Sequence, residues 1–232
     1  MDYNILIGGE AGQGLKTTAF LLGKILFREG YHVYSTKNYM SRVRGGHNFI
    51  KIRFADKKIN GPKDEVDMII ALNEETINKH SNSLNEKGLI LADNDNEKLD
   101  KLIEIKAKEI AKDINPKGVN TVFIASFLKA FGFDLKIAKE VIREYFNEDS
   151  KKSKDNLELL KKGYESAKTL SESYSLSKKV DKNNRIYLDG NQAIGMGSAI
   201  AGVGFYTAYP MSPSTGILNY LAKRQKKLSI AV

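Results

Sequence analysis

The sequence predicts an α/β fold with a mainly parallel sheet flanked by helices, followed by the incomplete start of a second α/β domain. Short runs of strand length alternate with longer segments of helical period, and most of these runs are apolar throughout, as in strands covered on both faces. A polar stretch without apolar period, residues 171–185, is followed by an abrupt change of composition. We therefore expect a first domain over 1–170, a linker over 171–185 and part of a second domain over 186–232.

The elements of the first domain follow from apolar spacing and turn residues. The predicted strands are residues 3–7, 32–34, 49–54, 68–72, 89–92 and 102–105. The predicted helices are residues 17–27, 74–84, 121–131, 135–146 and 156–170. Asn120 and Asp134 stand where N-caps are expected, and Gly132 stands where a helix would stop.

The second part is rich in small residues from 190 to 204. It then predicts a strand over 205–209, a proline-containing turn over 210–214, a helix over 216–227 and a strand over 228–232. A β-α-β unit of this size does not bury its own apolar faces. We therefore expect either the remainder of a larger domain or a partner to cover them.

Composition and charge exclude several classes of protein. Cysteine is absent, which excludes disulfides, cysteine-ligated iron–sulfur clusters and thiolate zinc sites within this chain and suits a reducing cytoplasm. No apolar stretch reaches the length of a membrane span, and the first residues do not resemble a signal peptide. Most of the net charge of +9 arises after residue 150, because residues 1–150 carry a net charge of +1. The basic residues there are interleaved with acidic ones, so nucleic-acid binding is a minor hypothesis.

The segment Gly8–Gly14 (GGEAGQG) joins a predicted buried strand to a predicted helix. Such a junction directs backbone N–H groups and the positive end of the helix dipole at a bound anion, and glycine lets the ligand approach the backbone. The spacing does not match a Walker A sequence or a complete dinucleotide fingerprint. We predict anion binding by Gly9, Gly12, Gln13 and Gly14; the alternative is a tight turn with close helix–strand packing.

A second candidate site is the loop at residues 38–48 (NYMSRVRGGHN). Arg42 and Arg44 carry guanidinium groups suited to phosphate or carboxylate, and two glycines follow them. Loops at strand ends of α/β sheets line the crevice where such folds bind ligands, so this loop is a candidate partner of the glycine segment. A subunit contact is an equally good interpretation. His47 is expected to have a structural or contact role, and no metal site is indicated.

Four segments in chain order resemble the 2-oxoacid:ferredoxin (2-oxoacid:acceptor) oxidoreductases. The strand-GGEAGQG-helix segment, SRVRGGHNF and the helix NLELLKKGYESA resemble the γ subunit or γ domain. The segment GNQAIGMGSAIAGVGFYTAYPMSPST resembles the start of the α subunit, as in members in which γ is fused ahead of α. The resemblance covers nearly the whole chain, and it implies a γ-type domain over 1–170 and the N-terminal fragment of a thiamine-pyrimidine-type domain over 186–232.

The resemblance also implies an activity. This family oxidatively decarboxylates a 2-oxoacid on thiamine diphosphate, passes electrons through iron–sulfur clusters to ferredoxin and releases acyl-CoA. The γ domain helps to bind coenzyme A, which assigns Gly9, Gly12, Gln13 and Gly14 to its phosphates and Arg42 and Arg44 to their charge. In the YPxTPS-like turn, Ser212 takes the position of the hydroxyl residue at the substrate carboxylate. For Ser214 we expect N-capping of the next helix.

The same resemblance implies partners. The glutamate that activates thiamine, the diphosphate and magnesium motif and the cluster ligands are not found in this sequence. We therefore expect no catalytic residue in this chain, which alone should be inactive, and a cytoplasmic hetero-oligomer. Its partners would be a β subunit carrying thiamine diphosphate and Mg²⁺, the remainder of α, and ferredoxin or a cluster subunit. The alternative is a non-catalytic CoA- or nucleotide-binding assembly module; the particular 2-oxoacid is left open.

Overall fold

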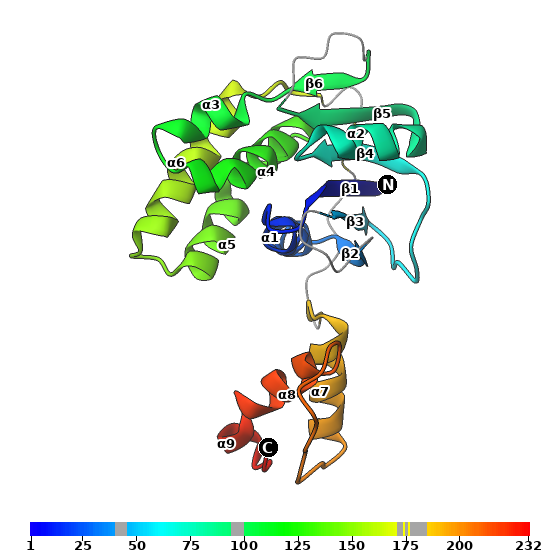
Figure 1. Ribbon diagram of the computed structural model, residues 1–232, viewed down its shortest axis with the longest axis vertical. Helices are drawn as coiled ribbons and strands as arrows, with labels where there is room; N and C mark the ends of the chain where they lie inside the picture. The colour runs from blue at the N-terminus through cyan, green and yellow to red at the C-terminus, as the bar shows by residue number, and fades with distance from the viewer. Residues whose placement is uncertain (40–45, 94–99, 171–173, 175, 177–184) are drawn as a thin grey trace. The chain divides into compact units, whose positions relative to one another are not determined.

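The computed structural model describes residues 1–39, 46–93, 100–170, 174, 176 and 185–232. The chain forms two compact units, Met1–Lys182 and Asn183–Val232, each described by itself. In the first unit, the strands are β1 (Asp2–Glu10), β2 (His32–Tyr39), β3 (His47–Ala55), β4 (Val66–Ala71), β5 (Leu84–Ala92) and β6 (Leu102–Glu104) (Figure 1). Its helices are α1 (Leu15–Arg28), α2 (Glu74–His80), α3 (Ala107–Lys112), α4 (Val119–Ala130), α5 (Lys136–Phe146) and α6 (Lys151–Ser166), with short 3-10 helices η1 (Ser81–Ser83) and η2 (Pro116–Gly118).

The strands form one sheet in the order β2-β3-β1-β4-β5-β6. Neighbours β1 and β4, β4 and β5, and β5 and β6 are parallel, whereas β3 is antiparallel to both β1 and β2. Among the described strands only β3 therefore runs against the others, and the prediction of a mainly parallel sheet is confirmed. Strand β2 is longer than predicted, because its backbone pairs with β3 as far as Tyr39, which lies opposite Asn48 in the register.

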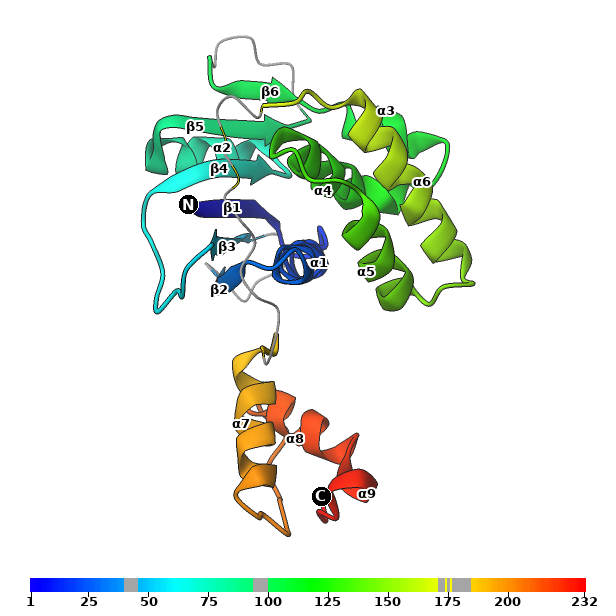
Figure 2. The ribbon, with the colours of Figure 1, turned by 180° about the vertical axis from the view of Figure 1, so that it is seen from behind.

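The two faces of the sheet carry different layers of helices. Ile5 and Ile7 of β1 belong to the large core that includes residues of α1, α4, α5 and α6. The intervening Leu6 belongs to a smaller cluster with Ile77 of α2. Since side chains of a strand alternate between faces, α2 lies on the face opposite α1 and α4. It is seen on the near side of β4 and β5 in Figure 1 and on the far side in Figure 2.

The helix boundaries correct three local predictions. Helix α5 begins at Lys136 with Leu135 as its N-cap residue, so Asp134 lies one position before the N-cap, although its Oδ1 atom accepts a hydrogen bond from the Lys136 N–H group at 2.7 Å. Helix α4 begins at Val119 after Gly118, so Asn120 lies in its first turn and is not the N-cap. Helix α6 begins at Lys151, five residues before the predicted start, because Ser150 caps it by accepting a hydrogen bond from the Ser153 N–H group. The prediction for Gly132 is confirmed, since it follows α4 with a φ of 75°.

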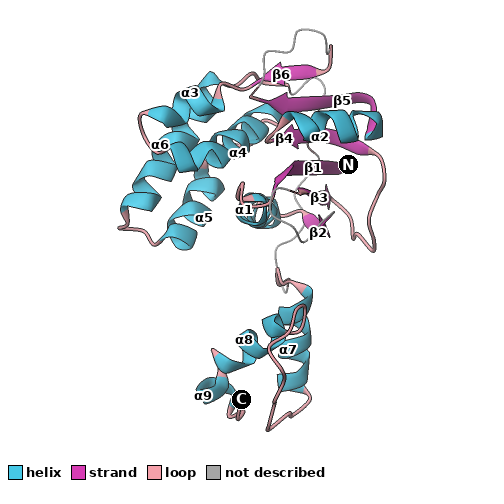
Figure 3. Cartoon of the chain, viewed as in Figure 1, coloured by secondary structure: helices cyan, strands magenta, loops and turns pink. Residues whose placement is uncertain are grey.

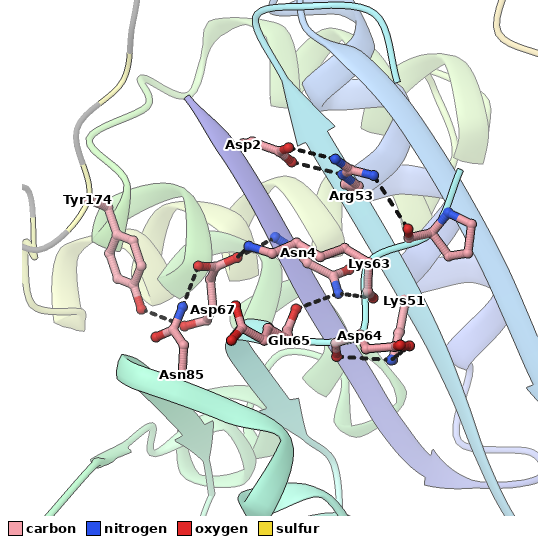
Figure 4. A network of polar contacts seen from close by, with 11 residues as sticks. Asp2, Asn4, Lys51, Arg53, Lys63, Asp64, Glu65, Asp67, Asn85 and Tyr174 are labelled. Carbon is pink, nitrogen blue, oxygen red and sulfur yellow. Dashed lines mark hydrogen bonds and ion pairs between the residues drawn. The ribbon is translucent and has the colours of Figure 1, made fainter. Parts of the chain in front are cut away.

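A polar network lies at the amino ends of β1, β4 and β5 (Figure 4). The buried carboxylate of Asp67 accepts hydrogen bonds from the Asn4 N–H group at 2.7 Å and from Asn85 Nδ2 at 2.6 Å. The Tyr174 hydroxyl donates to the Asp67 carbonyl at 2.9 Å, and the Tyr174 ring stacks on Phe131 with centroids 4.3 Å apart. Tyr174 falls within the stretch predicted as a linker, yet it is a core residue of the first unit.

The second unit is helical where it is regular (Figure 3). It contains α7 (Gly190–Ile200), α8 (Thr215–Ala222) and α9 (Gln225–Leu228). Asp189 and Gln192 form a capping box at the start of α7. The predicted strands at 205–209 and 228–232 are reduced to one bridge between Phe205 and Ala231. A strand needs a paired neighbour along its length, and within the described residues of this unit neither segment has one.

The second unit also exposes much of its apolar surface. Its buried hydrophobic residues, among those described, are Leu221 and Ile230. Ile194, Phe205, Tyr209 and Met211 are exposed to more than half of their surface, as are Ile186 and Ile200. This agrees with the expectation that such a unit does not bury its own apolar faces. In the described part of the chain, no helix combines the length and the apolar character needed to cross a membrane.

Candidate functional site

The glycine segment forms a shorter turn than the sequence predicts. Strand β1 continues through Gly8 and Gly9 to Glu10, because these residues pair with β3. The turn is therefore residues 11–14, and Gly9 is a strand residue at its edge. Gly12 and Gly14 have φ values of 99° and 77°, which side-chain-bearing residues rarely adopt.

Hydrogen bonds within the chain hold this turn in place. The Gln13 N–H group donates to the Glu10 carbonyl at 3.2 Å, and the Glu10 N–H group donates to Gln13 Oε1 at 2.7 Å. The Gln13 side chain thus stabilises the turn through its oxygen. An anion would have to interact with its Nε2 group, because an amide oxygen is only an acceptor.

The turn leads directly into the amino terminus of α1. Gly14 is the N-cap residue and has no side chain to satisfy the first-turn N–H groups, and that turn contains no acidic residue. These groups and the helix dipole favour an anion at this position. Lys16 adds a positive charge in the first turn, whereas the exposed Glu10 adds a negative one before it.

The structure adds Asn120, which the sequence analysis interpreted as a helix cap. Its Nδ2 group donates to the Gln13 carbonyl at 2.7 Å, although 107 positions separate the two residues. A β-carbon added to Gly14 would lie 2.5 Å from the same Nδ2 atom. The first turn of α4 is therefore in contact with the glycine turn. No local pattern in the sequence reveals a contact over this separation.

Residues Arg42 and Arg44 lie outside the described residues. The residues that flank their segment are described. Tyr39 pairs with Asn48 across β2 and β3, and the Gly46 carbonyl accepts a hydrogen bond from the Ala11 N–H group at 3.3 Å. Both ends of the segment thus join the sheet at the edge that carries the glycine turn.

Two histidines meet beside this edge. His47 pairs with Glu10 across β3 and β1, is buried, and has its Nε2 atom 2.9 Å from Nε2 of His80 at the end of α2. One ring donates and the other accepts, so at least one is neutral. Burial is the main cause that lowers the pKa of both rings, that of His80 to about 4. The pair joins α2 to β3, which agrees with a contact role for His47.

The remaining predicted site residue, Ser212, lies in the second unit. It is exposed and is followed by Pro213 through a cis peptide bond. The Pro213 carbonyl accepts a hydrogen bond from Asn191 Nδ2 at 3.1 Å, which attaches this turn to α7. Ser214 stands at the N-cap position of α8, as predicted, but its hydroxyl makes no capping hydrogen bond and donates instead to the Met211 carbonyl at 2.9 Å.

Comparison with known proteins supports one family. Residues 4–166 match the family described as pyruvate ferredoxin/flavodoxin oxidoreductase. The chain is 22% identical to a 2-oxoacid:ferredoxin oxidoreductase subunit alpha of Sulfolobus sp, over 98% of this chain and 43% of that protein. It is 24% identical to the 2-oxoglutarate synthase subunit KorC of Methanocaldococcus jannaschii, over 73% of this chain and 96% of that protein.

Solved structures show the same fold. A 2-oxoglutarate:ferredoxin oxidoreductase from Magnetococcus marinus, solved with 2-oxoglutarate, coenzyme A and succinyl-CoA bound, has a TM-score of 0.84 at 22% identity, covering 100% of this chain and 43% of that chain. The pyruvate oxidoreductase subunit PORC of Thermotoga maritima has a TM-score of 0.60 at 22% identity, covering 71% of this chain and 96% of that chain. This chain thus spans 43% of the length of the alpha-subunit relative.

Proposed function

The chain belongs to the pyruvate ferredoxin/flavodoxin oxidoreductase family, and on that premise we propose that it is part of a 2-oxoacid:ferredoxin oxidoreductase. The assembled enzyme would oxidatively decarboxylate a 2-oxoacid, transfer the electrons to ferredoxin and release acyl-CoA. In this proposal the first unit, a γ-type domain, contributes to the coenzyme A site, and the second unit contributes to the 2-oxoacid site. The activity belongs to the assembly and not to this chain alone.

The observation that carries the proposal is the arrangement at the carboxyl end of β1. The glycine turn, the uncapped first turn of α1 and the first turn of α4 meet there through the contact of Asn120 with Gln13. Backbone N–H groups that are not covered by a side chain fit the diphosphate of coenzyme A. Gly12 supports this fit, since a β-carbon added there would meet open space within 4 Å. A ligand can therefore approach the backbone closely.

Arg42 and Arg44 would supply the positive charge that balances the ligand's phosphates. Support comes from the hydrogen bond of Gly46 with Ala11, which attaches one end of the arginine segment to the glycine turn. Guanidinium groups bind phosphate in a bidentate manner and stay protonated at all relevant pH values. The equal alternative, a contact with a partner subunit, is tested by the same substitutions.

Ser212 would donate a hydrogen bond to the carboxylate of the 2-oxoacid. Its hydroxyl lies on an exposed turn that is fixed to α7 through Asn191, so it is accessible to a substrate. Thiamine diphosphate would supply the electron sink for decarboxylation. We assign this cofactor, Mg²⁺ and the iron–sulfur clusters to other segments or subunits. For the clusters, the reason is that this chain has no cysteine to ligate one.

The decisive experiment measures coenzyme A affinity by calorimetry on the complex purified from the native host. Replacing both Arg42 and Arg44 by alanine is expected to weaken coenzyme A binding by at least tenfold, since each charge-assisted hydrogen bond contributes about 1.5–3 kcal/mol. Arg143→Ala is the matched control, because this exposed arginine of α5 pairs only loosely with Glu148 at 3.8 Å. Unchanged affinity in the double variant would refute the role of the arginines.

A second measurement tests the substrate role and the alternative function. Ser212→Ala is expected to raise the KM for the 2-oxoacid with no change in coenzyme A affinity, and Ser212→Thr is expected to restore it. If the purified complex contains no thiamine-dependent partner, or if coenzyme A binds without any effect on turnover, the chain is a non-catalytic binding module and the proposed function is wrong.

A further inference from the structure

The turn that carries Ser212 is held by a side chain that is distant in the sequence. Asn191 lies in the first turn of α7, and its Nδ2 group donates to the Pro213 carbonyl at 3.1 Å across 22 positions. Pro213 directly follows Ser212. Among the described residues, the hydroxyl of Ser212 has no hydrogen-bond partner, so it is available to a ligand. The position of this hydroxyl therefore depends on how the turn is fixed.

Asn191 is itself fixed on two sides. In the capping box, the Gln192 N–H group donates to Asp189 Oδ1 at 2.9 Å, and the Asp189 N–H group donates to Gln192 Oε1 at 3.2 Å. This box holds the first turn of α7 in place. On the other side, α8 leaves room for the Asn191 side chain because residue 216 is glycine: a β-carbon added to Gly216 would lie 2.8 Å from Asn191 Cγ. The amide group is thus confined between the two helices.

The turn also has local hydrogen bonds, but these meet at a single carbonyl oxygen. The Met211 carbonyl accepts a hydrogen bond from the Ser214 hydroxyl at 2.9 Å and another from the Thr215 N–H group at 3.2 Å. These bonds close the turn without attaching it to α7. Among the hydrogen bonds of the described residues, that of Asn191 is the one that joins the turn at 210–214 to α7.

We propose that Asn191 is a positioning residue for the 2-oxoacid site. Its hydrogen bond to Pro213 fixes the place of the adjacent Ser212 hydroxyl, which binds the substrate carboxylate. The inference rests on the proposed function and adds to it a residue that acts only through Ser212. A displacement of about 1 Å at a reacting site can lower the rate by about 100-fold, so one hydrogen bond outside the site has a measurable effect.

The experiment measures steady-state kinetics of the complex purified from the native host, with pyruvate, 2-oxoglutarate and 2-oxoisovalerate as probes. Asn191→Asp keeps the size of the side chain but replaces the donor by an oxygen that repels the Pro213 carbonyl. A carboxylate in the first turn of α7 favours the helix, so this variant should fold. We expect kcat/KM for the 2-oxoacid to fall by at least about tenfold, with the KM for coenzyme A unchanged.

A double-variant cycle tests whether Asn191 acts through Ser212. In the Ser212→Ala background, Asn191→Asp should change kcat/KM by less than about twofold, because the hydroxyl that it positions is gone. A direct effect of the new charge on the substrate would persist in that background. Hydrogen–deuterium exchange over residues 209–214 gives a readout that does not depend on activity, and it should increase in Asn191→Asp.

Asn219→Asp is the matched control. This exposed residue of α8 receives the same substitution, and among the described residues its side chain forms no hydrogen bond, so kinetics and exchange should stay those of the wild type. The inference is wrong if Asn191→Asp leaves the 2-oxoacid kinetics unchanged, if its effect persists in the Ser212→Ala background, or if the control shows the same loss. An unchanged KM in Ser212→Ala alone would refute both the role of Ser212 and this inference. Absence of turnover with all three probes would instead refute the proposed function.

Discussion

Substitution of Tyr174 tests whether the segment after α6 is part of the folded core. The ring is only 3% exposed, stacks on Phe131 at 4.3 Å and meets Tyr3 edge-on at 5.6 Å. Tyr174→Ala removes these contacts and leaves a cavity, so we expect the free energy of unfolding to fall by about 3–5 kcal/mol. Tyr174→Phe removes only the hydrogen bond to the Asp67 carbonyl, for an expected loss of about 0.5–1.5 kcal/mol.

The assay is urea unfolding of the full chain followed by far-UV circular dichroism. Burial raises the pKa of the Tyr174 hydroxyl well above its ordinary value, so the hydroxyl stays protonated and the effect of Tyr174→Phe should not change between neutral and mildly alkaline pH. In thermal unfolding, each kcal/mol corresponds to about 2–4 °C for a unit of this size.

Tyr145 provides the matched control. Its ring is 43% exposed, and its hydroxyl lies 3.4 Å from that of Thr17. Tyr145→Phe should change the free energy of unfolding by less than about 0.5 kcal/mol. If Tyr174→Ala costs no more than Tyr145→Ala, then Tyr174 does not belong to the core and the reasoning from its burial is refuted.

Three further predictions concern pH and backbone strain. Burial lowers the pKa of His80 to about 4 from the ordinary 6.5, so the unfolded chain binds more protons between these values. The free energy of unfolding should therefore fall by roughly 1–2 kcal/mol as the pH falls from 6.5 to 4, after allowance for partial exposure. In urea titrations, His80→Gln should reduce this dependence on pH. The Arg53 guanidinium donates to the Asp2 carboxylate and lowers its pKa. Arg53→Met should therefore lower the free energy of unfolding by about 1 kcal/mol at pH 7. The difference in stability between the variant and the wild type should shrink once the pH falls below the ordinary Asp2 pKa of 3.8. Gly12→Ala should lower the free energy of unfolding by about 1–2 kcal/mol through its positive φ alone. In the same titrations, Gly14→Ala should lower it by at least about 1 kcal/mol more, because the added β-carbon would also clash with Asn120 of α4. Equal losses for the two variants would show that the contact with α4 contributes nothing.

Local sequence patterns were sufficient for most elements of the first unit. Apolar runs such as that around Ile69 and Ile70 locate buried strands, because both faces of a parallel strand are covered and polar residues are excluded. The glycine turn is also visible, since only glycine readily adopts the φ values found at Gly12 and Gly14. These signals depend on neighbouring residues along the chain and need no knowledge of the fold.

The same patterns failed where a partner decides the structure. Residues 205–209 are strand-like in composition, yet they form a single bridge because the backbone hydrogen bonds of a strand require a paired neighbour. The extension of β1 through Gly8 and Gly9 was missed for the opposite reason: pairing with β3 holds two glycines in a strand that their own propensity disfavours.

The sequence by itself therefore determined the alternation of strands and helices, the positions of the tight turns and the family motifs, since all of these are short-range patterns of size, polarity and backbone freedom. Only the tertiary structure decided which side chains meet. Asn120 contacts Gln13, His47 contacts His80, and Tyr174 contacts Asp67 over separations of 107, 33 and 107 positions. Such contacts follow from the order of strands in the sheet and the layers of helices on its two faces. That arrangement is selected by burial of apolar surface across the whole unit, and no local segment encodes it.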